Sequence, residues 1–184
     1  VVTEAGFGAD LGAEKFLNIK CRKSKLVPSC VVIVATVRAL KMHGGLEKDN
    51  LKKENIPALK KGLVNLERHI SNIKKFGLEP VVAINHFVLD TNNEIKEIKK
   101  FCDNIGVEVS VSSHWANGGK GATDLAKKVI KICKNSNKNN FKYLYTEKLS
   151  PWKKIEKIAK EIYGAKTVTA PTEVMNDLRK FELN

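Results

Sequence analysis

Short apolar runs rich in β-branched residues recur along the chain, and each leads into polar or glycine-rich sequence. The first run, residues 31–35, reads Val-Val-Ile-Val-Ala and shows no alternation of apolar and polar positions. Such a run is typical of a strand buried on both faces, and strands of that kind belong to parallel sheets covered by helices. Residues 81–84 and 107–111 predict two further strands.

Helical periodicity separates these runs. Apolar residues recur every three or four positions from Ile56 to Phe76, which predicts a long amphipathic helix that ends at Gly77. Thr91 and Glu94 form a capping box for the next helix. Further along, the pattern predicts a third helix whose inward-facing residues are Leu125, Ala126, Val129, Ile130 and Cys133.

The alternation of strands and helices predicts an α/β fold with a doubly wound, mainly parallel sheet and right-handed crossovers. We expect residues 1–134 to form an α/β core that carries a ligand cleft. Residues 135–184 would then be an extension with two helices and a short strand. Its first helix is capped by Ser150, its strand covers residues 166–170 and its last helix covers residues 171–181.

Composition narrows the class of protein. With 184 residues and 42% hydrophobic residues the chain suits a globular fold. No apolar run approaches the roughly 18 residues of a membrane span, and no signal-peptide pattern opens the chain, so we expect no membrane contact and a cytoplasmic location. The four cysteines have no metal-ligand spacing and are interpreted as reduced, structural thiols.

The formal net charge of +13 leaves several partners open. The lysines are spread over many segments, and aromatic residues make up only 7% of the chain. The favoured interpretation of the charge is a lysine-rich solvated surface. An anionic small-molecule ligand is the second interpretation, and a nucleic-acid partner is the third. We therefore expect no nucleic-acid partner.

Candidate chemistry gathers where the predicted strands end, because ligands of open α/β sheets bind beyond the carboxyl ends of the strands. Trp115 stands in a loop of small residues and is expected to be an exposed platform, and Phe87 stands at the matching place after the second strand. Two such aromatic rings could sandwich a flat heterocycle, with stacking worth about 0.5–1.5 kcal/mol beyond area burial. The polar and basic residues at the first two strand ends are Thr36, Arg38, Lys41, His43, Asn85 and Asp90.

Three glycines, Gly6, Gly8 and Gly12, lie within seven residues near the start of the chain. A structural turn is favoured there over a phosphate-binding loop. The basic residues 20–25 that follow are interpreted as a connector. No Walker A motif occurs, and the four histidines fall on different predicted elements, so we expect no metal site and identify no catalytic residue.

Residues 34–45, Val-Ala-Thr-Val-Arg-Ala-Leu-Lys-Met-His-Gly-Gly, resemble the signature of formate–tetrahydrofolate ligase, also called 10-formyltetrahydrofolate synthetase. The resemblance extends over nearly the whole chain. It includes Thr-Glu-Ala-Gly-Phe-Gly-Ala-Asp-Leu-Gly at residues 3–12, Asn-Leu-Glu-Arg-His-Ile at 65–70, Val-Ala-Ile-Asn at 82–85, Phe87, Asp90-Thr91, Trp115, Gly118-Gly119 and Glu-Ile-Tyr-Gly-Ala at 161–165.

The resemblance implies ATP-dependent formylation of tetrahydrofolate by formate through formyl phosphate, with Mg²⁺ and a monovalent cation as further cofactors. It also implies a sheet like that of P-loop NTPases, here without the Walker A segment. By resemblance, Phe87, Val111 and Trp115 bind the folate, and the stretch from Thr36 to Gly45 lines or supports the cleft. The loop near the formyl phosphate comprises Gly6, Gly8, Leu11 and Gly12.

The family enzyme is much longer than this chain, so the resemblance implies the central-to-C-terminal part of a ligase that forms homo-oligomers. The family's phosphate-binding lysine loop is expected to lie upstream of Val1, and we expect the chain alone to be inactive. Two alternatives remain open. One is a basic module that binds nucleic acid or another polyanion, and the other is a non-catalytic assembly domain.

Overall fold

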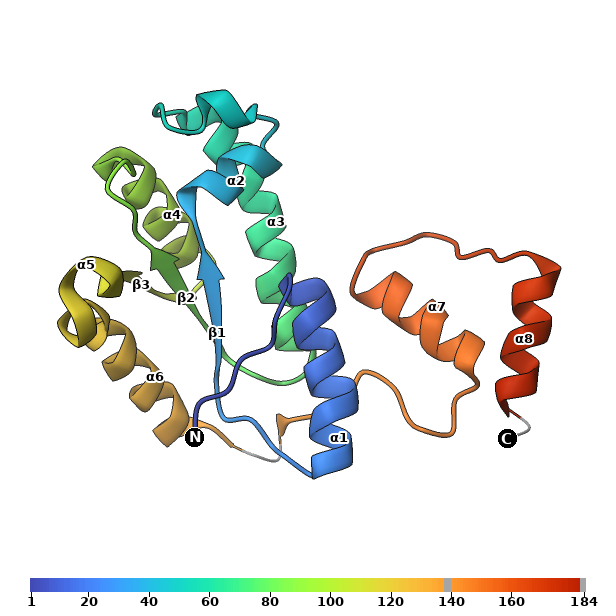
Figure 1. Cartoon of the computed structure of the whole chain (residues 1–184). Coiled ribbons are helices and arrows are strands. Elements are labelled where there is room, and N and C mark those ends of the chain that lie inside the picture. Colours follow the sequence, from blue (N-terminus) through green and yellow to red (C-terminus); the bar gives the residue numbers. More distant parts are fainter. Residues whose placement is uncertain (138–139, 183–184) are drawn as a thin grey trace. The chain divides into compact units, whose positions relative to one another are not determined.

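The computed structural model describes residues 1–137 and 140–182. The chain forms two compact units, drawn together in Figure 1. One unit contains Val1–Val27 and Phe141–Asn184, and the other contains Pro28–Asn140. The boundary expected after residue 134 stays a prediction.

The second unit is built on a parallel sheet of three strands, β1 (Val31–Ala35), β2 (Pro80–Asn85) and β3 (Glu108–Ser112). The spatial order is β1-β2-β3, so β2 is central and pairs in parallel with both neighbours (Figure 1). The three predicted strands and their parallel arrangement are confirmed.

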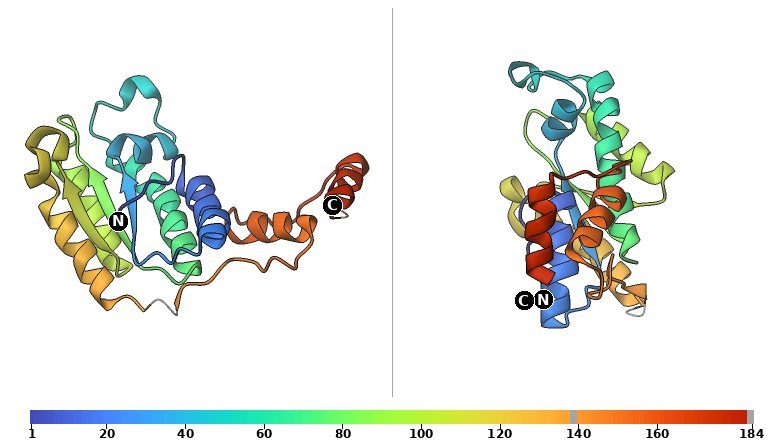
Figure 2. Two further views of the ribbon diagram at one scale, coloured as in Figure 1. Left: turned by 60° about the horizontal axis from the view of Figure 1, so that its bottom comes forward. Right: turned by 90° about the vertical axis from the view of Figure 1, so that its right-hand side faces the viewer.

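Helices cover both faces of this sheet. The helices α3 (Ile56–Lys75) and α4 (Asn92–Asn104) pack against each other on one face. The helix α6 (Thr123–Asn135) lies on the opposite face, against β2 and β3 (Figure 2). The α/β fold with a doubly wound parallel sheet is therefore confirmed, whereas the likeness to P-loop NTPases stays a prediction.

The expectation that β1 is buried on both faces is wrong. Ile33 and Ala35 are buried, but Val32 and Val34 are exposed, and Val34 keeps 65% of its surface. The reason is the place of the strand. β1 lies at the edge of the sheet, and α6 packs on β2 and β3, so α6 does not cover the outer face of β1.

The chain turns from β1 directly into a helix that the sequence reasoning missed, α2 (Val37–His43). Thr36 caps it, since the Thr36 side chain accepts a hydrogen bond of 3.1 Å from the backbone N–H of Ala39. A one-turn 3₁₀ helix, η3 (Lys48–Asn50), follows in the loop before α3.

The helices α2 and α3 pack backbone against backbone. A Cβ atom built on Gly62 of α3 would lie 1.8 Å from the carbonyl oxygen of Leu40, and one built on Gly44 would lie 1.8 Å from the carbonyl oxygen of Ala58. Each helix pair of this kind needs a residue without a side chain at the crossing. The two glycines therefore fix the distance between α2 and α3.

The predicted extent of α3 and the predicted start of α4 are confirmed. Asn55 caps α3 by accepting from the N–H of Ala58, and Gly77 follows α3 with a positive φ of 74°. At α4 the capping box is complete, because Thr91 accepts from the N–H of Glu94 while the Glu94 carboxylate accepts from the N–H of Thr91.

The loop after β3 also contains short helices that were not predicted, α5 (His114–Asn117) and η4 (Gly118–Ala122). The inward face predicted for α6 is wrong in part. Leu125 and Val129 are half-buried, but the side chains of Ala126, Ile130 and Cys133 are exposed, Ile130 at 53%. All four cysteines are free, and Cys133 does not have the buried position expected of it.

The first unit is helical. Its N-terminal part contains two π-helical segments, η1 (Ala9–Ala13) and η2 (Phe16–Lys20), which lead into α1 (Cys21–Ser24). The basic residues 20–25 therefore end a helical segment, and their interpretation as a connector is wrong. Arg22 donates to the carbonyl oxygen of Tyr145, and its guanidinium lies 3.9 Å from the ring centre of Tyr143.

The C-terminal part of this unit contains α7 (Pro151–Glu161) and α8 (Thr172–Glu182). The side chain of Ser150 caps α7 by accepting from Lys153, so both predicted helices are confirmed. The short strand expected at residues 166–170 is wrong, because these residues form no strand. No described helix in either unit is long and apolar enough to cross a membrane.

The crossing of α2 and α3 gives a stability test. Gly62→Ala would place a methyl group against the Leu40 carbonyl, and we expect it to lower the free energy of unfolding by about 1–3 kcal/mol. Alanine has the higher helix propensity, so a gain would be expected if the crossing had room. Urea denaturation measures the change.

The matched control is Gly119→Ala, since a Cβ atom at Gly119 meets no atom within 4 Å. We expect that substitution to change the free energy of unfolding by less than about 0.5 kcal/mol. Equal unfolding midpoints for the two variants would contradict the close crossing.

Candidate functional site

The candidate site lies at the edge of the sheet where the three parallel strands end. Beyond β1 the chain enters α2, beyond β2 it enters the loop of residues 86–91, and beyond β3 it enters α5. Because the strands are parallel, these three segments emerge at the same edge. The structure thus brings to one edge the three segments that carry the predicted site residues of the second unit, apart from His43 at the end of α2.

The loop of residues 86–91 is held firmly at its beginning. The N–H of His86 donates to the carbonyl oxygen of Ser112 at 3.0 Å, which closes the last pair of β2 and β3, Asn85 and Ser112. The indole N–H of Trp115 donates to the carbonyl oxygen of His86 at 3.2 Å. Trp115 is therefore tied to the residue that precedes Phe87.

A tight turn follows. The N–H of Phe87 donates to the carboxylate of Asp90 at 2.8 Å, and the N–H of Asp90 donates back to the carbonyl oxygen of Phe87 at 2.9 Å. Asp90 therefore orients the backbone that carries Phe87. The intervening Val88 and Leu89 are exposed.

The aromatic rings at this edge have the exposure that ligand stacking needs. Trp115 is 59% exposed, which confirms the exposure expected of it, and Phe87 is half-buried. That the two rings stack on a ligand stays a prediction. The Arg38 guanidinium lies 5.3 Å from the ring centre of Phe87, within the range of a cation–π contact. The Arg38 Nε atom is buried and has no hydrogen-bond partner in the described part of the chain.

Behind this edge lies a buried ion pair between Lys41 of α2 and Glu94 of α4. The Lys41 Nζ atom lies 2.8 Å from Glu94 Oε1 and also donates to the carbonyl oxygen of Lys53 at 2.8 Å. Lys41 is 2% exposed and Glu94 is fully buried. Lys41 was expected to line or support the cleft; its side chain is buried, and a supporting role stays a prediction.

Glu94 stays charged in this setting. Burial by itself would raise the pKa of its carboxyl, but hydrogen bonds from Lys41 and from the backbone N–H groups of Thr91 and Asn55 outweigh burial, so the pKa lies below its ordinary value of 4.5. The sequence showed Glu94 only as half of a capping box. Its contacts with Lys41 and Asn55 join segments far apart in sequence and had no local signal.

The other predicted residues have different settings. The Thr36 side chain caps α2, and Asn85 is the half-buried last residue of β2. Val111 is half-buried in β3, one residue before the strand ends. His43 is exposed and ends α2, a helix that begins at the strand edge and leads away from it.

The glycine-rich loop belongs to the first unit. A Cβ atom on Gly12 would lie 1.7 Å from the carbonyl oxygen of Gly6, and the N–H groups of Leu11 and Gly12 both donate to the carbonyl oxygen of Gly8. These contacts give Gly12 a packing role inside the π-helical segment η1, which the sequence did not predict. Phe7 has a φ of 69° and is 91% exposed.

Phe7 was missed as a candidate residue. A bulky residue rarely adopts a positive φ, and strained residues of this kind cluster at ligand sites. The available signal was its position between two glycines in the sequence Gly-Phe-Gly. Among the described residues, no group of three or more His, Cys, Asp or Glu side chains could hold a metal ion.

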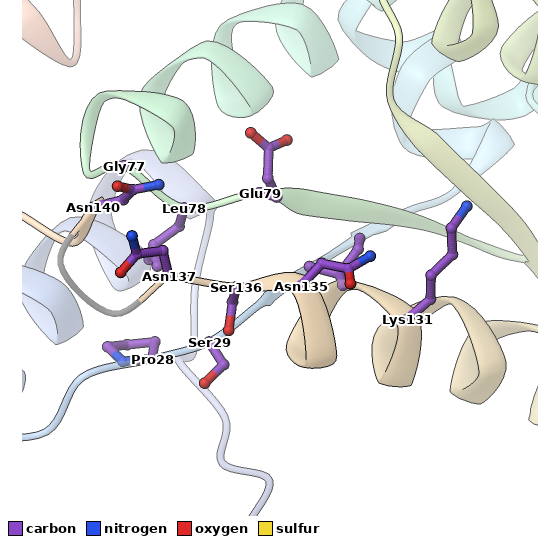
Figure 3. A pocket seen from close by; sticks show the side chains of 11 residues that line it. Pro28, Ser29, Gly77, Leu78, Glu79, Lys131, Asn135, Ser136, Asn137 and Asn140 are labelled. Atoms are coloured by element: carbon purple, nitrogen blue, oxygen red, sulfur yellow. The ribbon is translucent and has the colours of Figure 1, made fainter.

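A pocket of about 170 Å³ lies at the other edge of the sheet, near the amino ends of β1 and β2 (Figure 3). Its lining includes Pro28, Glu79, Lys131 and Asn135. None of the residues predicted for the site lines this pocket. Its lining residues precede β1 and β2 or lie at or after the end of α6, so it is separate from the segments at the strand ends.

The parallel sheet and the segments that leave its strand ends define a class, the parallel α/β proteins, in which ligands bind outside the carboxyl ends of the strands. The family model described as "Formate--tetrahydrofolate ligase" matches residues 1–184. The chain therefore belongs to the formate–tetrahydrofolate ligase family.

Curated relatives named formate–tetrahydrofolate ligase are close in sequence. One from Pelagibacter ubique is 63% identical over 182 residues and one from Ruegeria pomeroyi is 53% identical over 182 residues; in both cases the match covers 99% of this chain and 32% of the relative. One from Staphylococcus aureus is 52% identical over 184 residues, which is 100% of this chain and 33% of the relative. The chain thus spans about a third of the length of these relatives.

The lowered pKa of Glu94 predicts how stability depends on pH. The charged carboxylate stabilises the fold fully above pH 4.5, and this contribution is lost as the pH falls through the lowered pKa. Glu94→Gln leaves Lys41 buried without its counter-ion, so we expect a loss of about 3–5 kcal/mol at neutral pH. The difference from the unchanged chain should shrink below pH 4.5, as measured by urea denaturation at several pH values.

Glu97→Gln is the control, because Glu97 lies on the same helix and pairs with Lys60 of α3 at the surface. Surface pairs contribute about 0–1 kcal/mol, so little change is expected at any pH. A constant difference between Glu94→Gln and the unchanged chain from pH 7 to pH 3 would refute the lowered pKa.

Proposed function

We propose that this chain carries the folate-binding part of a formate–tetrahydrofolate ligase. The observation that carries the proposal is the pair of ring-bearing segments at adjacent strand ends. Phe87 follows His86, and Trp115 donates a hydrogen bond to the His86 carbonyl. The reaction is inferred from the family membership. The flat ring of the substrate would bind between the segments that carry Phe87 and Trp115.

The reaction has two steps. The γ-phosphoryl group of ATP passes to an oxygen of formate, which gives formyl phosphate and ADP. The N10 amine of tetrahydrofolate then attacks the formyl carbon, the bond to the phosphate oxygen breaks, inorganic phosphate leaves and N10 loses its proton. Activation is needed because formate has no good leaving group, whereas formyl phosphate has one.

The described residues suit the second substrate. Phe87 and Trp115 would contact the faces of the pteridine ring, with Val111 beside it. Arg38 over Phe87 adds positive charge at the same edge. The net charge of +13 suits ATP, formate and the carboxylates of folate, all of which are anionic.

The remaining assignments rest on the family alone. Gly6, Gly8, Leu11 and Gly12 would lie near the formyl phosphate, and the complete enzyme would be a homo-oligomer. Mg²⁺ is expected to act on phosphate groups, but the described residues offer no cluster of three metal-binding side chains. We assign no step to Mg²⁺ or to a monovalent cation.

Stacking on Trp115 can be tested by fluorescence. The chain contains two tryptophans, so Trp152→Phe leaves Trp115 as the single indole, and its emission should change as tetrahydrofolate binds. In a chain with unchanged Trp152, Trp115→Ala should weaken tetrahydrofolate binding about tenfold or more by calorimetry, since stacking and buried area are both lost.

Trp152→Phe also serves as the control, because Trp152 lies on α7 in the other unit. Its affinity should equal that of the unchanged chain. Equal affinity for Trp115→Ala would remove Trp115 from the site.

We expect the 184-residue chain alone to produce no 10-formyltetrahydrofolate from ATP, formate and tetrahydrofolate. The physical reason is that phosphoryl transfer depends on a cradle of backbone N–H groups and a lysine, and no Walker A sequence occurs in the chain. Chromatographic detection of the product checks this, with the Pelagibacter ubique relative as the positive control. ATP-dependent product formation by the chain would contradict it.

A further inference from the structure

We propose that the buried ion pair of Lys41 and Glu94 is a positioning pair that holds the loop of residues 86–91, and through it Phe87, in place for folate. The folate part of this inference rests on the proposed function. The part that concerns the loop rests only on the contacts described above.

The Glu94 carboxylate uses both of its oxygens. Oε1 accepts from Lys41 Nζ at 2.8 Å and from the N–H of Asn55 at 3.1 Å. Oε2 accepts from the N–H of Thr91 at 3.1 Å and from the Thr91 hydroxyl at 3.2 Å. One buried carboxylate thus joins α2, the start of α3 and the last residue of the loop.

The loop has two anchors, and the pair supplies the second one. At the first anchor, His86 is bonded to Ser112 and to Trp115. At the second anchor, Thr91 is bonded to Glu94, with a further hydroxyl contact to the exposed Glu54. The residues between the anchors include the exposed Val88 and Leu89, so they contribute little packing of their own.

The same pair also fixes the cation over the ring. Arg38 and Lys41 are three residues apart on α2 and therefore lie on the same side of that helix. Lys41 ties α2 to Glu94, and Glu94 ties the end of the loop that carries Phe87. The helix that carries Arg38 and the loop that carries Phe87 are therefore both held by the same buried carboxylate, that of Glu94.

Stability alone does not account for such a pair. Replacing a buried ion pair by apolar side chains of similar volume is often neutral or stabilising, so a buried pair is weak evidence for stability. What the pair provides here is geometry, because its charges and acceptors fix the directions of three segments at once.

Two double variants separate geometry from stability. Lys41→Met with Glu94→Leu removes both charges and the Glu94 acceptors for the backbone N–H groups of Thr91 and Asn55, and leaves no unpaired charge of this pair in the core. Lys41→Met with Glu94→Gln also removes both charges but keeps one side-chain acceptor for Thr91. Glu97→Gln on the same helix is the control, since its partner Lys60 is at the surface.

The first measurement needs no ligand. Amide hydrogen exchange of residues 86–91 should be about fivefold faster in the variant with Lys41→Met and Glu94→Leu, as expected for the loss of a capping acceptor. The variant with Lys41→Met and Glu94→Gln should restore part of the protection. In both double variants, exchange in residues 63–73 of α3 should stay unchanged. The Glu97→Gln control should match the unchanged chain in both segments.

The second measurement is tetrahydrofolate affinity, followed by Trp115 emission in the Trp152→Phe background. In the variant with Lys41→Met and Glu94→Leu the loop must become ordered when the ligand binds, so the affinity for tetrahydrofolate should be about fivefold lower. The variant with Lys41→Met and Glu94→Gln should recover part of this affinity.

Each outcome is decisive. Unchanged exchange in residues 86–91, or an equal increase in residues 63–73, would overturn the positioning role. Faster loop exchange with unchanged affinity would overturn its importance for folate. Failure of the unmodified chain to bind tetrahydrofolate would overturn the proposed function and the folate part of this inference, while the exchange data would still decide whether the pair holds the loop.

Discussion

The central position of β2 is the constraint on which the second unit depends. Its backbone groups pair with β1 on one side and β3 on the other, and its side chains from Pro80 to Ile84 are all buried. A strand used in this way has no face for solvent, so helices must cover both faces of the sheet around it. Its direction also decides where the chain emerges. The loop that carries Phe87 begins where β2 ends, beside the segments that leave β1 and β3.

Much of the fold could be predicted because the signals were local. Buried strands, the long helix α3 and the caps at Thr91 and Ser150 are each visible within a few neighbouring residues. The burial of β1 was predicted wrongly because a run of valines shows what a strand can bury and not whether a neighbour is present to cover it. The strand expected at residues 166–170 failed for a related reason, since a strand forms only beside another strand and the first unit contains none among its described residues.

In the candidate site, too, some residues could be predicted from local sequence and others could not. Phe87 and Trp115 stand out in the sequence because aromatic residues are unusual in loops of small and polar residues. Lys41 and Glu94 do not stand out, because a lysine and a glutamate on helices are usually solvated. Only the fold shows that their side chains meet across 53 positions of sequence inside the core.

The reciprocal glycine contacts between α2 and α3 have a consequence for how this chain can vary. Gly62 accommodates the backbone at Leu40, and Gly44 accommodates the backbone at Ala58, so the placement of α2 is set by one helix resting directly on the other. Within the connection between them, the segment from Leu46 to Asn50 does not determine that placement. Insertions and deletions there would lengthen or shorten a surface loop without shifting α2 relative to α3. This connection is therefore where the chain can change its length while the strand-end edge keeps its shape.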